Sequence, residues 1–292
     1  MRDPFLITGP TCLSFSGGRT SAYMLWRVLQ ANTPEDIARW LVVCFANTGK
    51  EEEATLRFVR DAEVHFGCHV VWLEYRPDGD GFAVVDFDTA SRNGEPFEAL
   101  IKKDRFLPSA VQRICTSRLK VRTMHKYLKT LGWHDGEDGW DQMIGIRADE
   151  QRRVARIRAR GTSTGTSKET MLVPLADAGV TVGDVAAFWR AQPFTLGLYT
   201  DSKGRTLGGN CDLCFLKPAA QILSLIAEKP QRAAWWARME THAQEHFVEK
   251  RNADGWRFRN DRPSYTQMAA YAADQGDMFD TDEEAIACFC GD

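Results

Sequence analysis

The residues with the clearest chemical potential are glycines and hydroxyl side chains near the amino terminus. Residues 12–16 are an apolar run typical of a strand, Gly17 and Gly18 follow, and residues 20–30 carry apolar side chains at helical spacing. Glycines let a backbone turn sharply towards an anion, and the free amides that begin a helix attract phosphate. The run also supplies polar donors, namely Ser16, Arg19, Thr20 and Ser21. We predict a phosphate-binding loop; the alternative is an ordinary glycine turn in which Thr20 or Ser21 caps the helix.

Cysteines are the second chemically informative group, with eight in the chain. Cys211 and Cys214 form a C-x-x-C pair just before an expected helix. Such a pair can give two thiolates to one metal ion or cluster, can form a redox disulfide, or can be coincidental. Three other cysteines lie in or beside apolar runs, where we expect buried thiols: Cys12, Cys44 and Cys68.

The elements that must position these residues alternate between strands and helices. Buried-type strands are expected at 41–46, 69–75 and 142–146, and helices at 50–66, 108–131 and 181–191. This order predicts an α/β, Rossmann-like fold with a parallel sheet and helices on both faces. Two further helices, near 217–228 and 231–248, indicate a smaller helical region. We therefore divide the chain into a nucleotide-binding domain, 1–199, and a helical C-terminal region, 200–292.

Composition limits the classes of function. The chain has 292 residues, 43% hydrophobic and 26% charged, with a formal net charge of −3. Whole-chain charge therefore gives no argument for nucleic-acid or membrane binding. The first residues are too polar for a signal peptide, and no run approaches the roughly 18 apolar residues of a membrane helix. We expect a cytoplasmic protein without a membrane partner, with its cysteines reduced.

Basic residues are concentrated in two segments. Six arginines fall within fourteen residues: Arg147, Arg152, Arg153, Arg156, Arg158 and Arg160. A second basic segment surrounds Cys115: Lys102, Lys103, Arg105, Arg113, Arg118, Lys120 and Arg122. Each segment is either a solvated charged face or a surface for phosphate and nucleic acid.

The strand–SGGxxS–helix pattern of residues 12–30 resembles the pyrophosphate loop of the ATP pyrophosphatase superfamily (PP-loop, adenine nucleotide alpha hydrolase-like). That superfamily includes the phosphoadenosine phosphosulfate (PAPS) reductase family. The usual loop is SGGKDS, whereas this chain has Arg19 and Thr20 in place of Lys and Asp. Later segments follow the family's order: Phe45 to Glu51, Gly145 to Glu150, Pro174-Leu175, Asp184-Val185, Leu198-Tyr199 and Cys211 to Cys214. The chain is most similar to phage- and prophage-type members of this family.

The resemblance implies a site for ATP, or for PAPS or adenosine phosphosulfate (APS), with Mg²⁺ as a further cofactor. The residues that it assigns to nucleotide binding are Ser16, Gly17, Gly18, Arg19, Thr20, Ser21, Asn47, Thr48, Gly49, Gly145 and Arg147. It gives catalytic roles to Lys50, Arg147 and Cys290.

The resemblance also implies a 4Fe–4S cluster held by Cys115, Cys211 and Cys214. Cluster-bearing reductases have Cys-Cys where this chain has Ile114-Cys115, so a fourth ligand must come from elsewhere, and Cys288 is our candidate. The tail has two alternatives: idle thiols, or a Cys290 thiolate that attacks the sulfur of a bound nucleotide, as the terminal Cys-Gly of PAPS reductases does.

Three functions fit this pattern. The first is an ATP-dependent adenylating enzyme with iron–sulfur-assisted sulfur transfer, onto a nucleic acid such as tRNA or DNA. The second is a PAPS or APS reductase that uses a cysteine thiolate. The third is a non-catalytic, nucleotide-binding regulatory protein. We expect a thioredoxin-like protein or a cysteine desulfurase as electron or sulfur donor, and a homo-oligomer.

Overall fold

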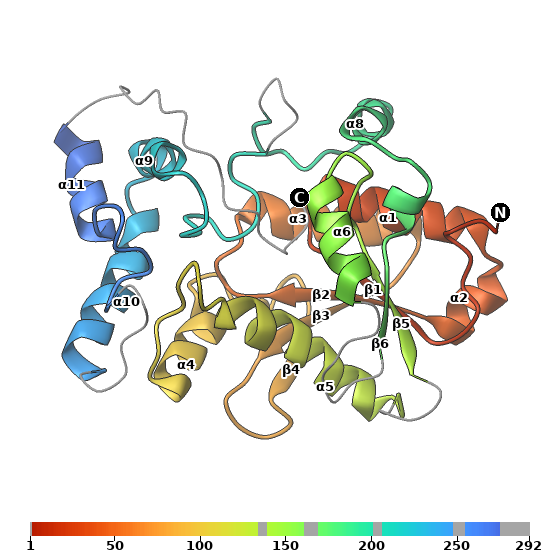
Figure 1. Ribbon diagram of the computed structural model, residues 1–292, viewed down its shortest axis with the longest axis horizontal. Coiled ribbons are helices and arrows are strands. Elements are labelled where there is room, and N and C mark those ends of the chain that lie inside the picture. The colour runs from red at the N-terminus through yellow and green to blue at the C-terminus, as the bar shows by residue number, and fades with distance from the viewer. Residues whose placement is uncertain (1, 134–138, 161–168, 201–205, 248–254, 275–292) are drawn as a thin grey trace.

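The computed structural model describes residues 2–133, 139–160, 169–200, 206–247 and 255–274. Within these ranges it contains a six-stranded sheet in the order β4-β3-β2-β1-β5-β6, drawn in Figure 1. The strands are β1 (Thr11–Ser14), β2 (Leu41–Asn47), β3 (Val70–Tyr75), β4 (Phe82–Val85), β5 (Trp140–Ile144) and β6 (Glu169–Leu172). All neighbouring pairs are parallel except β3 and β4, which are antiparallel. The predicted α/β, Rossmann-like fold is confirmed, with an antiparallel edge strand that was not predicted.

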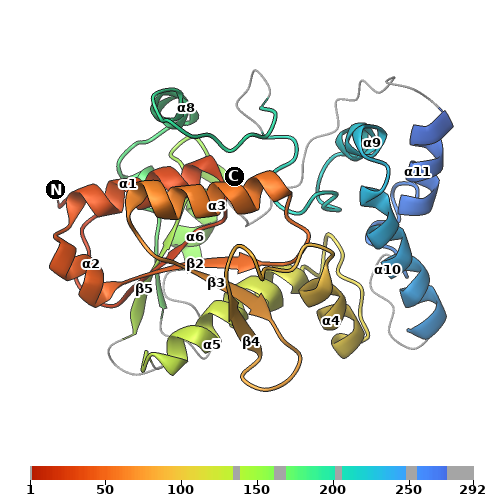
Figure 2. The same cartoon turned by 180° about the vertical axis from the view of Figure 1, so that it is seen from behind.

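Helices cover both faces of the sheet (Figures 1 and 2). On one face lie α1 (Arg19–Ala31), α3 (Glu53–Phe66) and α8 (Val182–Arg190), and on the other α5 (Arg122–Thr130) and α6 (Gln151–Arg160). The shorter helices α2 (Pro34–Trp40) and α7 (Pro174–Asp177) complete this part. Alternation along β2 explains the two cores, because Phe45 packs in the cluster with α1 and α3 while Cys44 packs in the cluster with α5.

The C-terminal helices pack as a separate group at one end of the sheet, α9 (Ala219–Glu228), α10 (Arg232–His246) and α11 (Tyr265–Asp274). They share one apolar cluster with α4 (Glu95–Asp104) and the π-helix η1 (Thr116–Val121). Phe97, Phe215, Trp236 and Phe258 are its fully buried aromatic members. The cluster therefore contains residues from both sides of residue 199, the predicted domain boundary. The domain division at that residue stays a prediction.

One local prediction needs correction. Helical structure was expected from residue 108, but helix begins only at Ile114 and continues into the π-helix η1. Three described elements lie where the sequence predicted none: β4 and α4 fall within residues 77–106, and α11 follows the last predicted helix. The sequence of α11 mixes alanines with polar residues, which leaves a weak helical pattern. None of the helices in the described ranges is long and apolar enough to cross a membrane.

Candidate functional site

The predicted phosphate loop lies where β1 ends and α1 begins, at the carboxyl edge of the parallel strands. Gly17 has a φ of +77°, and a Cβ there would lie 2.6 Å from Thr55 Cγ2, so only glycine fits without strain. Gly18 is the N-cap of α1, and no side chain caps the helix. The Ser21 hydroxyl instead donates to Gly18 O at 3.0 Å and accepts from Ser16 N at 3.2 Å. The first amides of α1 thus have no capping side chain, as a phosphate-binding turn requires.

A small pocket opens at this loop. One side of the pocket is lined by the loop residues Ser16, Gly17 and Gly18 and by Thr55 of α3. The other side is lined by residues that precede the cysteine pair in sequence: Leu196, Thr206, Gly209 and Asn210. The structure therefore brings the loop of residues 16–18 and the approach to the C-x-x-C together, although nearly two hundred positions separate them in sequence.

The two predicted phosphate-binding arginines lie differently. Arg147 Nη1 donates to Thr20 Oγ1 at 3.0 Å, while its Nε donates to Asp149 Oδ1 at 3.1 Å. Its guanidinium thus reaches from the end of β5 to the first turn of α1. Arg19 turns the other way: its Nη2 donates to Leu198 O at 3.4 Å and contacts Thr200 Oγ1. Burial lowers the pKa of Arg19.

Gly145 allows the end of β5 to lie directly on α1. A Cβ at this position would be 3.0 Å from Ser21 Cα, which is too close for an ordinary contact. The predicted role of Gly145 therefore has a packing basis: it lets Arg147, two residues later, approach the phosphate loop.

At the end of β2, the predicted ligands Asn47, Thr48 and Gly49 make contacts within the protein. Asn47 is fully buried; its Nδ2 donates to Glu74 Oε1 at 2.7 Å, and its Oδ1 accepts from Gly49 N at 3.0 Å. Thr48 N donates to Glu51 Oε2 at 2.9 Å. These hydrogen bonds hold the turn after β2, which lies at the carboxyl edge of the sheet.

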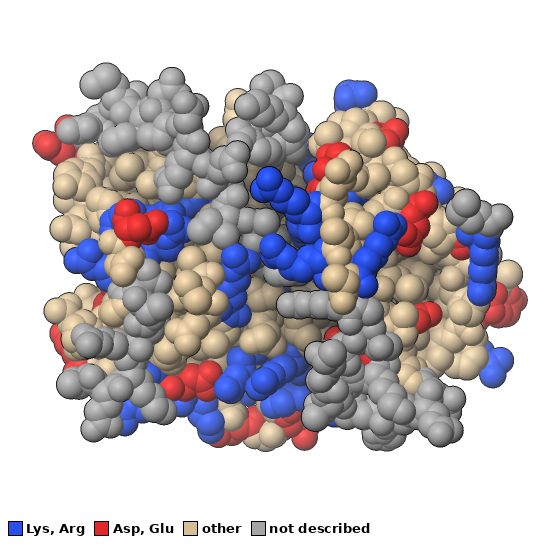
Figure 3. Space-filling view, in the orientation of Figure 1, with Lys and Arg blue, Asp and Glu red and all other residues tan. Residues whose placement is uncertain are grey.

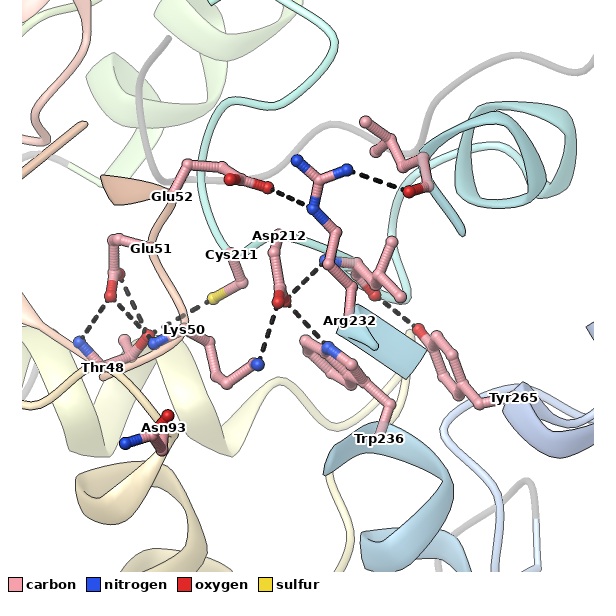
Figure 4. A network of polar contacts seen from close by, with 12 residues as sticks. Thr48, Lys50, Glu51, Glu52, Asn93, Cys211, Asp212, Arg232, Trp236 and Tyr265 are labelled. Carbon is pink, nitrogen blue, oxygen red and sulfur yellow. Dashed lines mark hydrogen bonds and ion pairs between the residues drawn. The ribbon is translucent and has the colours of Figure 1, made fainter. Parts of the chain in front are cut away.

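Lys50 points away from the phosphate loop. Its Nζ lies 2.9 Å from Asp212 Oδ2, and the two side chains are only 8% and 10% exposed. The ammonium also lies 5.3 Å from the centroid of the Trp235 ring. The residue predicted to be catalytic thus pairs with the acid inside the C-x-x-C (Figure 4).

The cysteine loop docks against the turn after β2. Cys211 forms an isolated antiparallel bridge with Glu51, and Asp212 N donates to Lys50 O at 2.7 Å. The Cys211 Sγ lies 3.5 Å from the Thr48 hydroxyl. Burial raises the pKa of Cys211 well above that of a free thiol, and the charges of Glu51 and Cys214 raise it further.

Two C-terminal helices hold the same loop from the opposite side, as Figure 4 shows. Trp236 Nε1, on α10, donates to Asp212 Oδ1 at 2.8 Å. Tyr265 Oη, at the start of α11, donates to Leu213 O at 2.6 Å. Sequence reasoning missed Asp212, Trp236 and Tyr265. One signal in the sequence could have found Asp212, because this acid lies between two cysteines of an expected buried loop. A buried carboxylate needs a charged or hydrogen-bonding partner.

The predicted cluster ligands share one neighbourhood but do not form a complete site. Cys115, Cys211 and Cys214 all pack in or against the same apolar cluster. Among the residues that the structure describes, however, no three His, Cys, Asp or Glu side chains are grouped so that they could hold a metal ion. Cys288 and Cys290 lie outside the described residues. The 4Fe–4S cluster and Mg²⁺ therefore stay predictions, and no step below is routed through either.

No protein-family model matches the chain. The chain is 30% identical over 221 residues, or 72% of its length, to the uncharacterized nin region protein ORF290 of Escherichia phage lambda, and covers 67% of that protein. It is also 25% identical over 251 residues to the uncharacterized protein MJ0066 of Methanocaldococcus jannaschii. That match includes 86% of this chain but spans only 45% of the archaeal protein. The chain therefore belongs to the family of the nin region protein ORF290 of phage lambda.

Proposed function

We propose that this protein is an ATP-binding enzyme of the PAPS reductase family, within the ATP pyrophosphatase superfamily, that adenylates an acceptor. The observation that carries the proposal is the loop at Gly17 and Gly18, where uncapped amides of α1 meet the Arg147 guanidinium at the carboxyl edge of the sheet. Amides and a guanidinium together suit the charge of a departing pyrophosphate.

The chemistry follows from this placement. An acceptor oxygen attacks the α-phosphorus of ATP, the bond from that phosphorus to the bridging oxygen breaks, and pyrophosphate leaves. The amides of α1 and Arg147 stabilise the charge that develops on the leaving group. The product is an acceptor that carries AMP, which is a good leaving group for a second nucleophile.

Sulfur transfer is the second step that we propose, because Gly209 and Asn210, which directly precede the C-x-x-C, line the pocket at the phosphate loop. A terminal sulfur carried as a persulfide on Cys211 or Cys214, supplied by a cysteine desulfurase, displaces AMP from the activated carbon. The other thiol then breaks the sulfur–sulfur bond, which leaves the new thiol on the acceptor and a Cys211–Cys214 disulfide. A thioredoxin-like reductant restores the two thiols.

A nucleic acid such as tRNA or DNA is the acceptor that the surface favours. Although the chain has a formal net charge of −3, Lys and Arg gather across the middle of the face in Figure 3, the side on which α5 and α6 lie. Exposed basic residues on these helices include Arg122, Arg152 and Arg156. Such a face neutralises backbone phosphates without reading sequence.

Exchange of labelled pyrophosphate into ATP tests the proposal. We expect exchange only when an acceptor RNA or DNA is present, because the α-phosphorus needs an oxygen nucleophile. Release of sulfite from PAPS or APS with no ATP turnover would establish the reductase alternative instead. Tight ATP binding in calorimetry with neither activity would favour the regulatory protein.

A further inference from the structure

The C-x-x-C loop contacts the turn after β2 through both backbone and side-chain interactions. The backbone part of this contact is short: one bridge between Glu51 and Cys211, and one hydrogen bond from Asp212 N to Lys50 O at 2.7 Å. So short a bridge does not by itself prevent the loop from slipping or opening. The side chains of Lys50 and Asp212 add a second link across the same contact, 2.9 Å long.

Burial makes this ion pair costly unless both groups are fully satisfied. The two side chains are 8% and 10% exposed, so each charge is largely removed from water. Asp212 Oδ1 also accepts from Trp236 Nε1 at 2.8 Å and from Leu213 N at 2.7 Å. Buried pairs contribute little net stability, and their best-attested use is to fix one register among alternatives.

The packing around Lys50 is adapted to the pair. A Cβ on Gly94 would lie 2.5 Å from Trp235 Nε1 and 2.9 Å from Lys50 Cδ. Gly94 N also donates to Gly49 O at 2.8 Å, which holds the α4 start against the turn after β2. The stem of Lys50 therefore follows one narrow path to Asp212.

The position of one thiol depends on this register. Cys211 directly precedes Asp212, and its Sγ lies 3.5 Å from the Thr48 hydroxyl. The Thr48 hydroxyl in turn donates to the Glu51 carboxylate, at 2.9 Å from Oε2. We propose that Lys50 and Asp212 are a positioning pair that locks Cys211 against the nucleotide-site strand β2, and that Lys50 therefore acts on the thiol and not on a phosphate.

Site-resolved alkylation of the full-length protein by iodoacetamide, read by mass spectrometry at fixed pH, tests this proposal. Cys68 lies before β3 at the opposite end of the sheet, and it is half-buried and not buried as the sequence predicted, so it is the internal reference. In Lys50→Met and in Asp212→Asn we expect the rate at Cys211, relative to Cys68, to rise at least about tenfold, because each variant removes the side-chain link between the C-x-x-C loop and the turn after β2. Lys102→Met, which breaks an exposed pair with Glu98, should leave the ratio unchanged.

The double variant Lys50→Met/Asp212→Asn separates positioning from stability. It leaves no unpaired buried charge, so its melting temperature should return close to that of the parent protein. The Cys211 rate should nevertheless stay high, because the link across the contact is missing. A Cys211 rate that falls back with the recovered stability, or that never changes in any variant, overturns the proposal.

A nucleotide arm extends the test and rests on the proposed function. ATP should change the Cys211 rate in the parent protein but not in the double variant. If calorimetry finds no ATP binding to the parent protein, the proposed function fails, while the ATP-free comparison still decides the positioning role. If ATP binds and changes Cys211 equally in both proteins, the positioning pair is refuted.

Discussion

Replacing Gly17 by alanine tests the phosphate loop directly, because Gly17 combines a left-handed backbone with close packing. Its φ is +77°, and the new Cβ would lie 2.6 Å from Thr55 Cγ2 and 3.2 Å from Phe45 Cε2. A left-handed non-glycine residue costs about 1–2 kcal/mol, and overpacking a core costs about 1–3 kcal/mol. We therefore expect Gly17→Ala to lower the free energy of unfolding by about 2–5 kcal/mol.

Thr55 offers a matched control for the collision. Thr55→Ser keeps the hydroxyl but removes the methyl group that the new Cβ would meet. Alone it should cost about 1 kcal/mol, the value of one buried methyl group. In Gly17→Ala/Thr55→Ser the closest collision is relieved, and the left-handed strain and the tight contact with Phe45 remain. The double variant should therefore be more stable than Gly17→Ala, which is the opposite of additive behaviour.

Urea unfolding followed by tryptophan fluorescence measures these free energies, and calorimetry measures ATP affinity. Because the added Cβ would point at Thr55 and Phe45, it should weaken ATP binding by displacing the loop, and affinity should recover in part in the double variant. Additive costs, or a Gly17→Ala protein as stable as the parent, would refute this account of the loop.

Three further predictions concern other parts of the chain. Arg147→Gln should weaken ATP binding, measured by calorimetry, at least about tenfold, since a charge-assisted contact is lost. The control Arg158→Gln breaks an exposed pair with Asp177 and should leave the affinity unchanged. Equal effects of the two variants would contradict a role of Arg147 in nucleotide binding. Burial raises the pKa of Glu240 from 4.5 to about 7. The folded state then holds a proton that the unfolded state releases, so stability should fall as pH rises from 4.5 to about 7 and stay level above that. Glu240→Gln should remove this part of the slope in urea titrations, and an unchanged slope would show that the carboxyl titrates normally. Replacing Arg122, Arg152 and Arg156 by glutamine should reduce the salt slope of tRNA or DNA binding by about 3; Arg57→Gln/Arg60→Gln, on the opposite face, is the control, and an equal loss there would indicate non-specific attraction.

The sequence was most informative where a signal is local. The strand, two glycines and helix of residues 12–30 predicted a phosphate-binding turn, and the structure has an uncapped helix start at Gly18 with Gly17 in the left-handed conformation. Such a pattern can be read from neighbours along the chain, because backbone freedom and side-chain periodicity act within a few residues. The alternation of buried strands with helices gave the α/β class for the same reason.

The sequence did not predict β4 and α11, because the apolar pattern of these two segments is weak. The edge strand β4 is short and half-exposed, with no clean alternation of apolar and polar residues. Helix α11 buries only Tyr265 and Met268 among its described side chains. Elements that bury so little leave a weak periodic pattern, so their formation depends on the surfaces onto which they pack.

The sequence by itself determined the alternation of the main strands and helices, the glycine turn between β1 and α1, and the presence of paired thiols. Only the tertiary structure decided that Lys50 pairs with Asp212, that Asn47 is committed to Glu74, and that Arg19 faces Leu198. It also decided that Cys115, Cys211 and Cys214 share one apolar cluster, although among the described residues no three His, Cys, Asp or Glu side chains are grouped as metal ligands. The physical reason is that the partner of a buried charge or thiol is selected by burial and geometry between segments far apart in the chain, and spacing along the sequence does not encode that distance.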